Sequence, residues 1–312
     1  MKNIDYSDRD RDGSVAFYVL LWRRRSISQR MFDDYWRDVH GPVCARLPGQ
    51  QQYWQFHLDR GEGGGLLPEI AGVDVDCPEE ERFDGIAELT FATEEDRSAW
   101  FEAAAILMDD EHNLFRKAIG YTTRPGRSRT YVDRIEQGAP NGPAGVVKLH
   151  IMIQKALGIQ IPALRAFLTE RLAPAMASSD RVLKLRMHLL EEVDSSRPDA
   201  AGVVHQEAPE QQYQAAIEIA FATRLDMEAF FASEAMAGVA AQLGRYVKRM
   251  SPFLERTAHT FVYGGKMTLS GQRGSTAAAL IEGVGAVNQL RDDVVDLMLT
   301  GSLGRTGRSI AA

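Results

Sequence analysis

The chain contains one stretch of sequence twice. Residues 83–101 read FDGIAELTFATEEDRSAWF, and residues 213–231 read YQAAIEIAFATRLDMEAFF. The two segments are identical at seven of 19 positions, among them Glu88 and Glu218, whereas average composition gives about one match by chance. Shorter matches recur elsewhere at the same offset of 130 or 131 residues. Self-similarity at a fixed period indicates repeated structural units, so the sequence predicts a tandem duplication.

Each half shows the same order of hydrophobic patterns. Apolar runs of strand length alternate with segments whose apolar residues recur at helical spacing, and Gly41 and Pro42 end the first such helix. The predicted order β-α-β-β-α-β is that of a ferredoxin-like unit. The first unit comprises residues 15–22, 27–40, 53–58, 83–91, 94–108 and 130–135, and the second comprises residues 146–153, 162–172, 182–190, 213–221, 225–243 and 257–263.

A four-stranded sheet with helices on one face leaves its other face uncovered. Two such sheets in one chain bury both faces most simply by packing against each other. We therefore expect an α+β fold of two tandem ferredoxin-like domains whose sheets form an intramolecular α/β barrel, followed by a C-terminal helix. The expected divisions are an N-terminal arm over 1–14, a site-bearing first domain over 15–138, a degenerate second domain over 139–265, and a linker with the C-terminal helix over 266–312.

Polar residues alternate with apolar ones along the strands of the second half. We expect the apolar set to face the helices and the polar set to line the contact between the two sheets. Buried charges are normally paired, so the favoured interpretation is an ionic seam. The histidines would also allow a metal site, but the sequence holds no HExxH motif and no metal is expected. The polar set comprises Lys148, His150, Lys184, Arg186, His188 and Glu218, and it is expected to meet Tyr53, Gln55, His57 and Glu88 of the first sheet.

Composition limits the kind of partner. The 312 residues are 45% hydrophobic and 25% charged, with a formal net charge of −7. A negative net charge argues against nucleic-acid binding, which needs clustered lysines and arginines. No apolar run approaches the roughly 18 residues of a membrane span, and two cysteines cannot build a disulfide framework. We therefore expect a cytoplasmic protein that binds a small hydrophobic molecule, and neither nucleic acid nor membrane.

The two halves differ at the end of their first helix. When the prolines of the two helices are aligned, Leu172 stands opposite His40. His40 follows Trp36 by four residues and Phe32 by eight, so it lies on the helix stripe that faces the sheet. A neutral imidazole at that depth can exchange a proton near pH 7. The alternative is a histidine that only stabilises the helix C-terminus through the macrodipole.

A second divergent segment extends the second helix of the first half. Residues 109–113 read DDEHN, and helical spacing places Glu111 on the stripe of Leu107 and His112 on the stripe of Met108, so at least one of them can face the interior. A carboxylate and an imidazole near His40 would make a proton relay, whereas the alternative is a solvated helix end. Tyr35 could supply a phenolic donor to an oxyanion.

These elements resemble one known family. The motif Phe32-x-x-Tyr35-Trp36-x-x-x-His40-x-Pro42, after a strand ending in WRR at residues 22–24, is similar to the EthD family of dimeric α/β-barrel proteins, and residues 109–115 resemble its acidic segment. The resemblance implies a small, mostly cofactor-free pocket between helices and sheet. Polyketide cyclases, dehydratases, decarboxylases and monooxygenases use such pockets, and some relatives bind haem. Because the second half departs from the motif at Leu172 and at residues 239–243, we expect one intact pocket per chain.

The resulting hypothesis is a cofactor-independent lyase, of dehydratase or cyclase type, that acts on a small hydrophobic carbonyl-bearing or aromatic compound. The alternatives are a cofactor-free monooxygenase, a haem-binding barrel protein and a non-catalytic accessory protein. No cofactor is expected. The expected catalytic residues are His40, His112, Glu111 and Tyr35, and the expected substrate contacts are Trp36, Tyr18, Trp22, Trp54, His57, Trp100 and Phe115.

Two long connections and the C-terminal segment complete the prediction. Residues 59–82 form a candidate lid beside the strand that carries His57, and residues 191–211 occupy the matching place in the second half. Residues 276–299 have apolar side chains at helical spacing and predict one amphipathic helix. An exposed apolar stripe of this kind usually marks an interface, so we expect a homodimer built on this helix.

Overall fold

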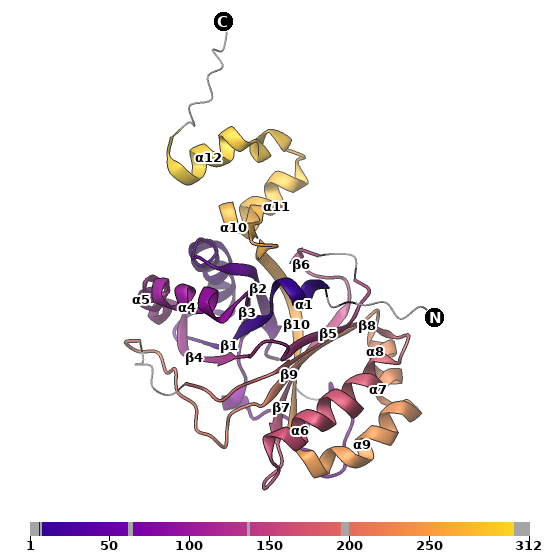
Figure 1. Cartoon of the computed structure of the whole chain (residues 1–312). Helices are drawn as coiled ribbons and strands as arrows, with labels where there is room; N and C mark the ends of the chain where they lie inside the picture. Colours follow the sequence, from indigo (N-terminus) through magenta and orange to yellow (C-terminus); the bar gives the residue numbers. More distant parts are fainter. Residues whose placement is uncertain (1–5, 7, 62–64, 136–137, 195–199, 303–312) are drawn as a thin grey trace, which may run out of the picture.

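The computed structural model describes residues 6, 8–61, 65–135, 138–194 and 200–302, so parts of the predicted arm and of the C-terminal segment lie outside the described residues (Figure 1). The first half comprises β1 (Val15–Arg23), α2 (Gln29–Tyr35), the π-helix η1 (Trp36–His40), α3 (Gly41–Cys44), β2 (Gln50–Asp59), β3 (Gly85–Phe91), α4 (Glu94–Ala103), α5 (Ala105–Leu114), β4 (Phe115–Thr122) and β5 (Ser128–Asp133). The second half comprises β7 (Val147–Lys155), α6 (Ile161–Phe167), the π-helix η3 (Leu168–Leu172), α7 (Ala173–Ala177), β8 (Val182–Leu189), β9 (Ala215–Phe221), α8 (Arg224–Phe231), α9 (Glu234–Tyr246) and β10 (Val247–Tyr263). Short elements are α1 (Asp8–Asp12), η2 (Glu79–Glu81), β6 (Asn141–Gly142) and β11 (Lys266–Met267).

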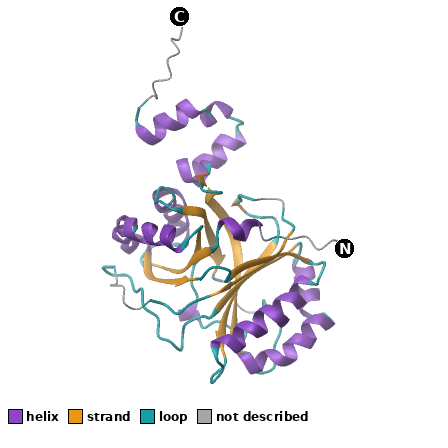
Figure 2. Ribbon diagram, in the orientation of Figure 1, coloured by secondary structure: helices purple, strands orange, loops and turns teal. Residues whose placement is uncertain are grey.

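The strands join the two halves into one sheet. Its order is β4-β1-β3-β2-β10-β7-β9-β8-β5, so each half has the ferredoxin-like order of its own four strands. The long strand β10 pairs with β7 of its own half and with β2 of the first half. Conversely, β5 follows β4 in the chain and pairs with β8 of the second half. This reciprocal exchange forms the predicted α/β barrel, with strands central and helices outside (Figure 2).

The prediction missed one strand of the first half and the beginning of the last strand of the second half. The strand expected over 130–135 is present as β5, but the fourth strand of the first half's own set is β4, which begins at Phe115. The strand expected over 257–263 belongs to β10, which begins at Val247. The prediction missed β4 because glycine and two adjacent cations make its sequence, FRKAIGYT, atypical of a strand. Gly120 is required there, because a Cβ at this position would collide with the ring of Phe17. The predicted helices over 94–108 and 225–243 are each divided into two shorter helices.

The outer face of the second half is apolar, as predicted. Leu149, Ile151, Leu185 and Ile217 are buried in one core cluster with side chains of α6 and η3. A separate cluster lies inside the barrel, between the two halves of the sheet, and includes Trp54, Phe56, Met152 and Phe253. Both faces of the sheet are therefore buried within one chain, so no second chain is needed to complete the barrel.

The ionic seam lies inside the barrel. Lys148 Nζ lies 3.0 Å from Glu218 and 2.7 Å from Glu255. The guanidinium of Arg186 lies 3.1 Å from Glu88. Each of these five side chains is at least nine-tenths buried, so their mutual pairing offsets part of the cost of removing them from water.

The predicted seam partners from the first half were partly wrong. Glu88 meets the seam, but Tyr53, Gln55 and His57 point away from it toward the helices of the first half. Trp54 lies opposite Glu88, and Arg186 lies opposite Glu218, so β2 and β8 correspond at an offset of 132 residues instead of 131. A slip of one residue moves every side chain of a strand to the other face.

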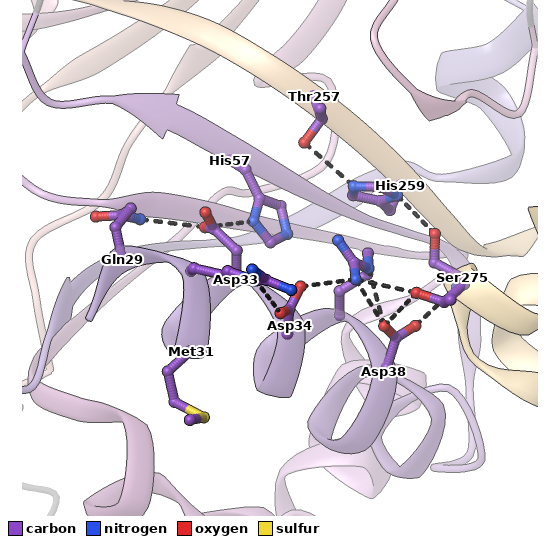
Figure 3. Close-up of polar contacts among 12 residues, drawn as sticks. Gln29, Met31, Asp33, Asp34, Asp38, His57, Thr257, His259 and Ser275 are labelled. Atoms are coloured by element: carbon purple, nitrogen blue, oxygen red, sulfur yellow. Dashed lines mark hydrogen bonds and ion pairs between the residues drawn. The ribbon is translucent and has the colours of Figure 1, made fainter. Parts of the chain in front are cut away.

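Three histidines are buried in neutral form. Burial lowers the pKa of His57 and His188, and it lowers the pKa of His259 to about 3. His57 hydrogen bonds to Asp33 at 2.9 Å, and His259 lies within 3.1 Å of Thr257 and 2.8 Å of Ser275 (Figure 3). The rings of His57 and His259 meet edge to face, with centroids 5.1 Å apart.

This burial predicts acid lability. The unfolded chain binds protons at these histidines below about pH 6.5, whereas the folded chain resists them. Stability is therefore full above that pH and falls below it, by at most about 1.4 kcal/mol per pH unit for each histidine. Urea unfolding of the wild type at pH 7.5 and pH 5 measures the loss. His259→Gln should show a smaller loss, and an equal loss in both proteins would contradict the prediction.

The C-terminal segment is more broken than predicted. It comprises α10 (Leu269–Arg273), α11 (Ser275–Gly283), the short helix η4 (Val287–Leu290) and α12 (Asp292–Thr300), in place of one helix. Ser275 and Ala278 anchor α11, but no residue of α12 is buried. The segment projects from the barrel (Figure 1) and exposes Leu280, Val284, Val287, Leu290, Leu297 and Met298. No helix among the described residues is long and apolar enough to cross a bilayer.

Candidate functional site

A cavity of about 630 Å³ lies in the first half, between the outer face of the sheet and the helices. Its floor comes from β1, β3 and β4, and its walls come from η1, α4 and α5. Glu192, Val193, Asp194 and His205 of the second half complete the lining. The lining includes Phe17, Val19, Leu21, Trp36, His40, Cys44, Tyr53, Leu89, Trp100, Phe101, Leu107, Met108, Glu111, Phe115, Ala118 and His205.

His40 forms a carboxylate–imidazole pair at this cavity. Its Nδ1 lies 2.9 Å from Oδ2 of Asp110, while the hydroxyl of Tyr35 donates to Oδ1 of Asp110 at 2.7 Å. The hydrogen bond from His40 is the main reason that the pKa of Asp110 falls to about 2, and the bond to Asp110 raises the pKa of Tyr35 to about 12. Asp110 is therefore ionised at neutral pH, so Nδ1 must carry a proton. Among the described residues, none hydrogen bonds Nε2 of His40.

Local backbone structure places His40 beside the sheet. Ser28 caps α2, and the helix widens into η1 at Trp36, whose carbonyl accepts a hydrogen bond from Gln55 at 2.9 Å. Gly41 follows because a Cβ at this position would collide with Phe261. Such π-turns are frequent at functional sites. The second half repeats the π-turn as η3, where Leu172 is fully buried in place of His40.

The second half contributes a histidine that the prediction missed. His205 Nε2 lies 2.6 Å from Oε2 of Glu111, and the backbone N–H of Ala200 donates to His205 Nδ1 at 3.1 Å. Backbone hydrogen bonds between Val204 and β4 hold this connection on the first half. The available signal was the recurrence of two long connections at equivalent places, but sequence alone does not show which half each one covers.

The predicted lid covers the other half. Residues 59–82 carry Leu66, Leu67 and Val73 into the core cluster of the second half, not over the cavity. The two connections are thus exchanged between the halves. The reason is that each connection follows the second strand of its own half, β2 or β8, and then packs on the other half.

The structure brings only some of the predicted residues together. His40, Glu111, Trp36, Trp100 and Phe115 line the cavity. Tyr35 reaches the site through Asp110, which the prediction left unassigned.

Other predicted residues lie elsewhere. Tyr18, Trp22 and Trp54 point into the barrel, because they alternate with the floor residues along their strands. His57 lies behind Trp36, with ring centroids 4.5 Å apart. His112 is exposed at the end of α5 and does not reach the cavity.

The fold and cavity define a two-unit α/β-barrel protein with a pocket in its first unit. Residues 24–118 match the EthD domain model, which confirms the resemblance predicted from the helix motif. No curated protein matches the chain.

Several solved structures are similar to this chain at low identity. An anthrone oxidase-like protein has 10% identity and a TM-score of 0.49, covering 82% of this chain and 95% of its own. A candidate monooxygenase from Lactobacillus acidophilus NCFM has 9% identity and a TM-score of 0.46, covering 82% and 99%. A dye-decolorizing peroxidase from Bacteroides thetaiotaomicron has 11% identity and a TM-score of 0.46, covering 82% and 96%. Likenesses this distant do not define a shared activity.

Proposed function

We propose that the protein is a cofactor-independent lyase, of dehydratase or cyclase type, with His40 as its general acid and base. The observation that carries this proposal is the hydrogen-bonded pair of His40 and Asp110 at a largely apolar cavity. Because Asp110 fixes the proton on Nδ1, the lone pair of Nε2 is available to accept a proton from a bound compound. Tyr35 and Asn113 hold Asp110 in place through hydrogen bonds of 2.7 and 3.0 Å.

The proposed substrate is a small hydrophobic compound with a carbonyl or an aromatic ring. Aromatic side chains of Trp36, Trp100 and Phe115 supply apolar contacts, and about 630 Å³ is within the usual range for a ligand pocket. Four carboxylates and one arginine among the lining residues favour a neutral or cationic compound over an anion. These charged residues are Arg97, Glu102, Glu111, Glu192 and Asp194.

Hydrogen exchange on a simple aromatic ketone tests the proposal without the natural substrate. In D₂O, the wild type should accelerate deuterium incorporation beside the carbonyl of 2-tetralone, measured by proton NMR. The rate should be equal under argon and under air, because no oxidation is involved. Binding without exchange would support an accessory role and overturn the proposal, and oxygen consumption in step with product would replace it with a monooxygenase.

The lining does not fit a haem, which some relatives of this superfamily bind. An imidazole backed by a carboxylate suits an iron ligand, and His40 has that form. The propionates of a haem, however, need cationic partners. Arg97 is the only lysine or arginine among the described lining residues, and the four carboxylates of the lining would repel the propionates.

We further propose that the fold arose by tandem duplication, with domains over 15–138 and 139–265 and with chemistry confined to the first. The repeated order of elements and the paired π-turns support this division. The proposed location is the cytoplasm, because two cysteines cannot build the disulfide framework typical of secreted proteins.

A homodimer through the C-terminal segment is also proposed. Shortening the chain after Gly283 keeps the buried Ala278 but removes the exposed stripe from Val284 to Leu299. Light scattering should then give about half the mass of the full-length protein, because a second copy is the proposed cover of the stripe. A chain ending at Ser302 is the matched control and should remain dimeric. Equal masses for the full-length and Gly283-ended proteins would contradict the prediction.

A further inference from the structure

The cavity contains a second acid–base pair that spans the two halves. Glu111 belongs to α5 of the first half, and His205 belongs to the connection of the second half. Both line the cavity, and Nε2 of His205 lies within hydrogen-bond distance of Oε2 of Glu111, at 2.6 Å. The pair is distinct from His40 and Asp110, although Asp110 and Glu111 are neighbours in α5.

The hydrogen-bond directions are determined by the backbone. Since the N–H of Ala200 donates to Nδ1 of His205, that nitrogen carries no proton. The proton of the neutral ring is therefore on Nε2, and it donates to Oε2 of Glu111. Among the described residues, none hydrogen bonds Oε1 of Glu111, so this oxygen is available to a bound compound.

Packing of the connection holds this geometry. Val203 is buried in the core cluster of the first half. The N–H of Val204 donates to the carbonyl of Arg116 at 3.1 Å, and its carbonyl accepts from Ala118 at 2.9 Å. Val204 makes both of these hydrogen bonds to β4, and it is the residue next to His205, so the position of His205 is fixed. The first half alone would lack this histidine.

We infer that Glu111 is the proton donor to a leaving hydroxyl group and that His205 is its positioning residue, which makes the substrate class a β-hydroxy ketone. The inference rests on the proposed function. His40 removes a proton from the carbon beside the carbonyl, and the C–H electron pair becomes the new C=C bond. Glu111 enters this step as the neutral acid, with its proton on Oε1 while Oε2 accepts the hydrogen bond from His205. The β-hydroxyl leaves as water, taking that proton. The proton on His40 then returns through solvent to Glu111.

The test uses 4-hydroxy-4-phenylbutan-2-one, whose dehydration gives a conjugated enone that absorbs in the ultraviolet. Glu111→Gln should slow this dehydration by about 10²-fold or more. Deuterium exchange into 2-tetralone needs no leaving group, so in the same variant it should fall by less than dehydration does. Glu95→Gln, an exposed change of the same kind on α4, is the matched control and should keep both rates.

Two substitutions at His205 separate positioning from folding. His205→Leu cannot donate a hydrogen bond to Glu111, so dehydration should fall about tenfold and the acidic limb of its pH profile should move. His205→Gln can donate one and should restore most of the rate.

The outcomes distinguish the two proposals. Dehydration unchanged in Glu111→Gln, or absent in a wild type that exchanges 2-tetralone, would overturn the inference alone. No exchange by the wild type would overturn the proposed function. An unshifted pH profile in His205→Leu, or no recovery in His205→Gln, would overturn the positioning role.

Discussion

Replacing His40 with glutamine is expected to slow deuterium exchange into 2-tetralone by about 10² to 10⁴-fold. Glutamine has a similar size and can donate a hydrogen bond to Asp110, but it cannot accept a proton from carbon. The loss should therefore appear in the exchange rate, measured by NMR at neutral pH, while the cavity remains formed.

A folding control makes this result interpretable. His40 is 7% exposed, so its replacement must be shown to leave the protein folded, by urea unfolding of the variant beside the wild type. A folded His40→Gln protein with the wild-type exchange rate would remove His40 from the mechanism. If the variant loses both its exchange activity and its cooperative unfolding transition, His40 is instead a structural residue.

Much of the fold followed from the repeat. Apolar periodicity is local, and two copies of each pattern supported one another, so the fold class and the barrel were predicted correctly, although β4 was missed. His40 was predicted for the same reason. Both halves have the same π-turn, so at this position they differ in the side chain, His40 or Leu172, and not in the backbone.

The face of β2 could not be predicted, because it depends on one irregularity. The pairing of β2 with β3 shifts between Gln50 and Gln52, and this shift moves the side chains that follow to opposite faces. Nothing in the local sequence marks the shift. The seam was therefore predicted with Tyr53 and His57 in it, and the structure places both against the helices.

His205 lay beyond prediction for a different reason. It is 94 residues from Glu111 in the chain, and the two meet only because the connections are exchanged between the halves. Hydrophobic periodicity assigns elements but does not show which half a loop covers. Contacts of this kind depend on tertiary packing, so functional residues on long connections are the ones most easily missed.

The seam of buried charges contains the side chain with the largest expected effect on stability. Arg186 is fully buried, with Nε and Nη2 each 3.1 Å from Glu88, and it also forms an ion pair with Asp10 of α1. Its Nη1 donates to Thr130 of β5 at 3.1 Å. The guanidinium thus links β8 to β3, β5 and the N-terminal helix at the junction of the two halves.

Arg186→Met should lower the free energy of unfolding by about 3–5 kcal/mol, because it leaves the buried carboxylate of Glu88 without its main cation. Urea unfolding at pH 7 measures the loss. Arg181→Met is the matched control, since that side chain is 51% exposed beside Asp226 and such surface pairs contribute about 0–1 kcal/mol. Adding Glu88→Gln to Arg186→Met should recover part of the stability by removing the stranded charge. A loss below about 1 kcal/mol for Arg186→Met would mean that water or neighbouring groups already compensate Glu88, and that the seam does not hold the two halves together.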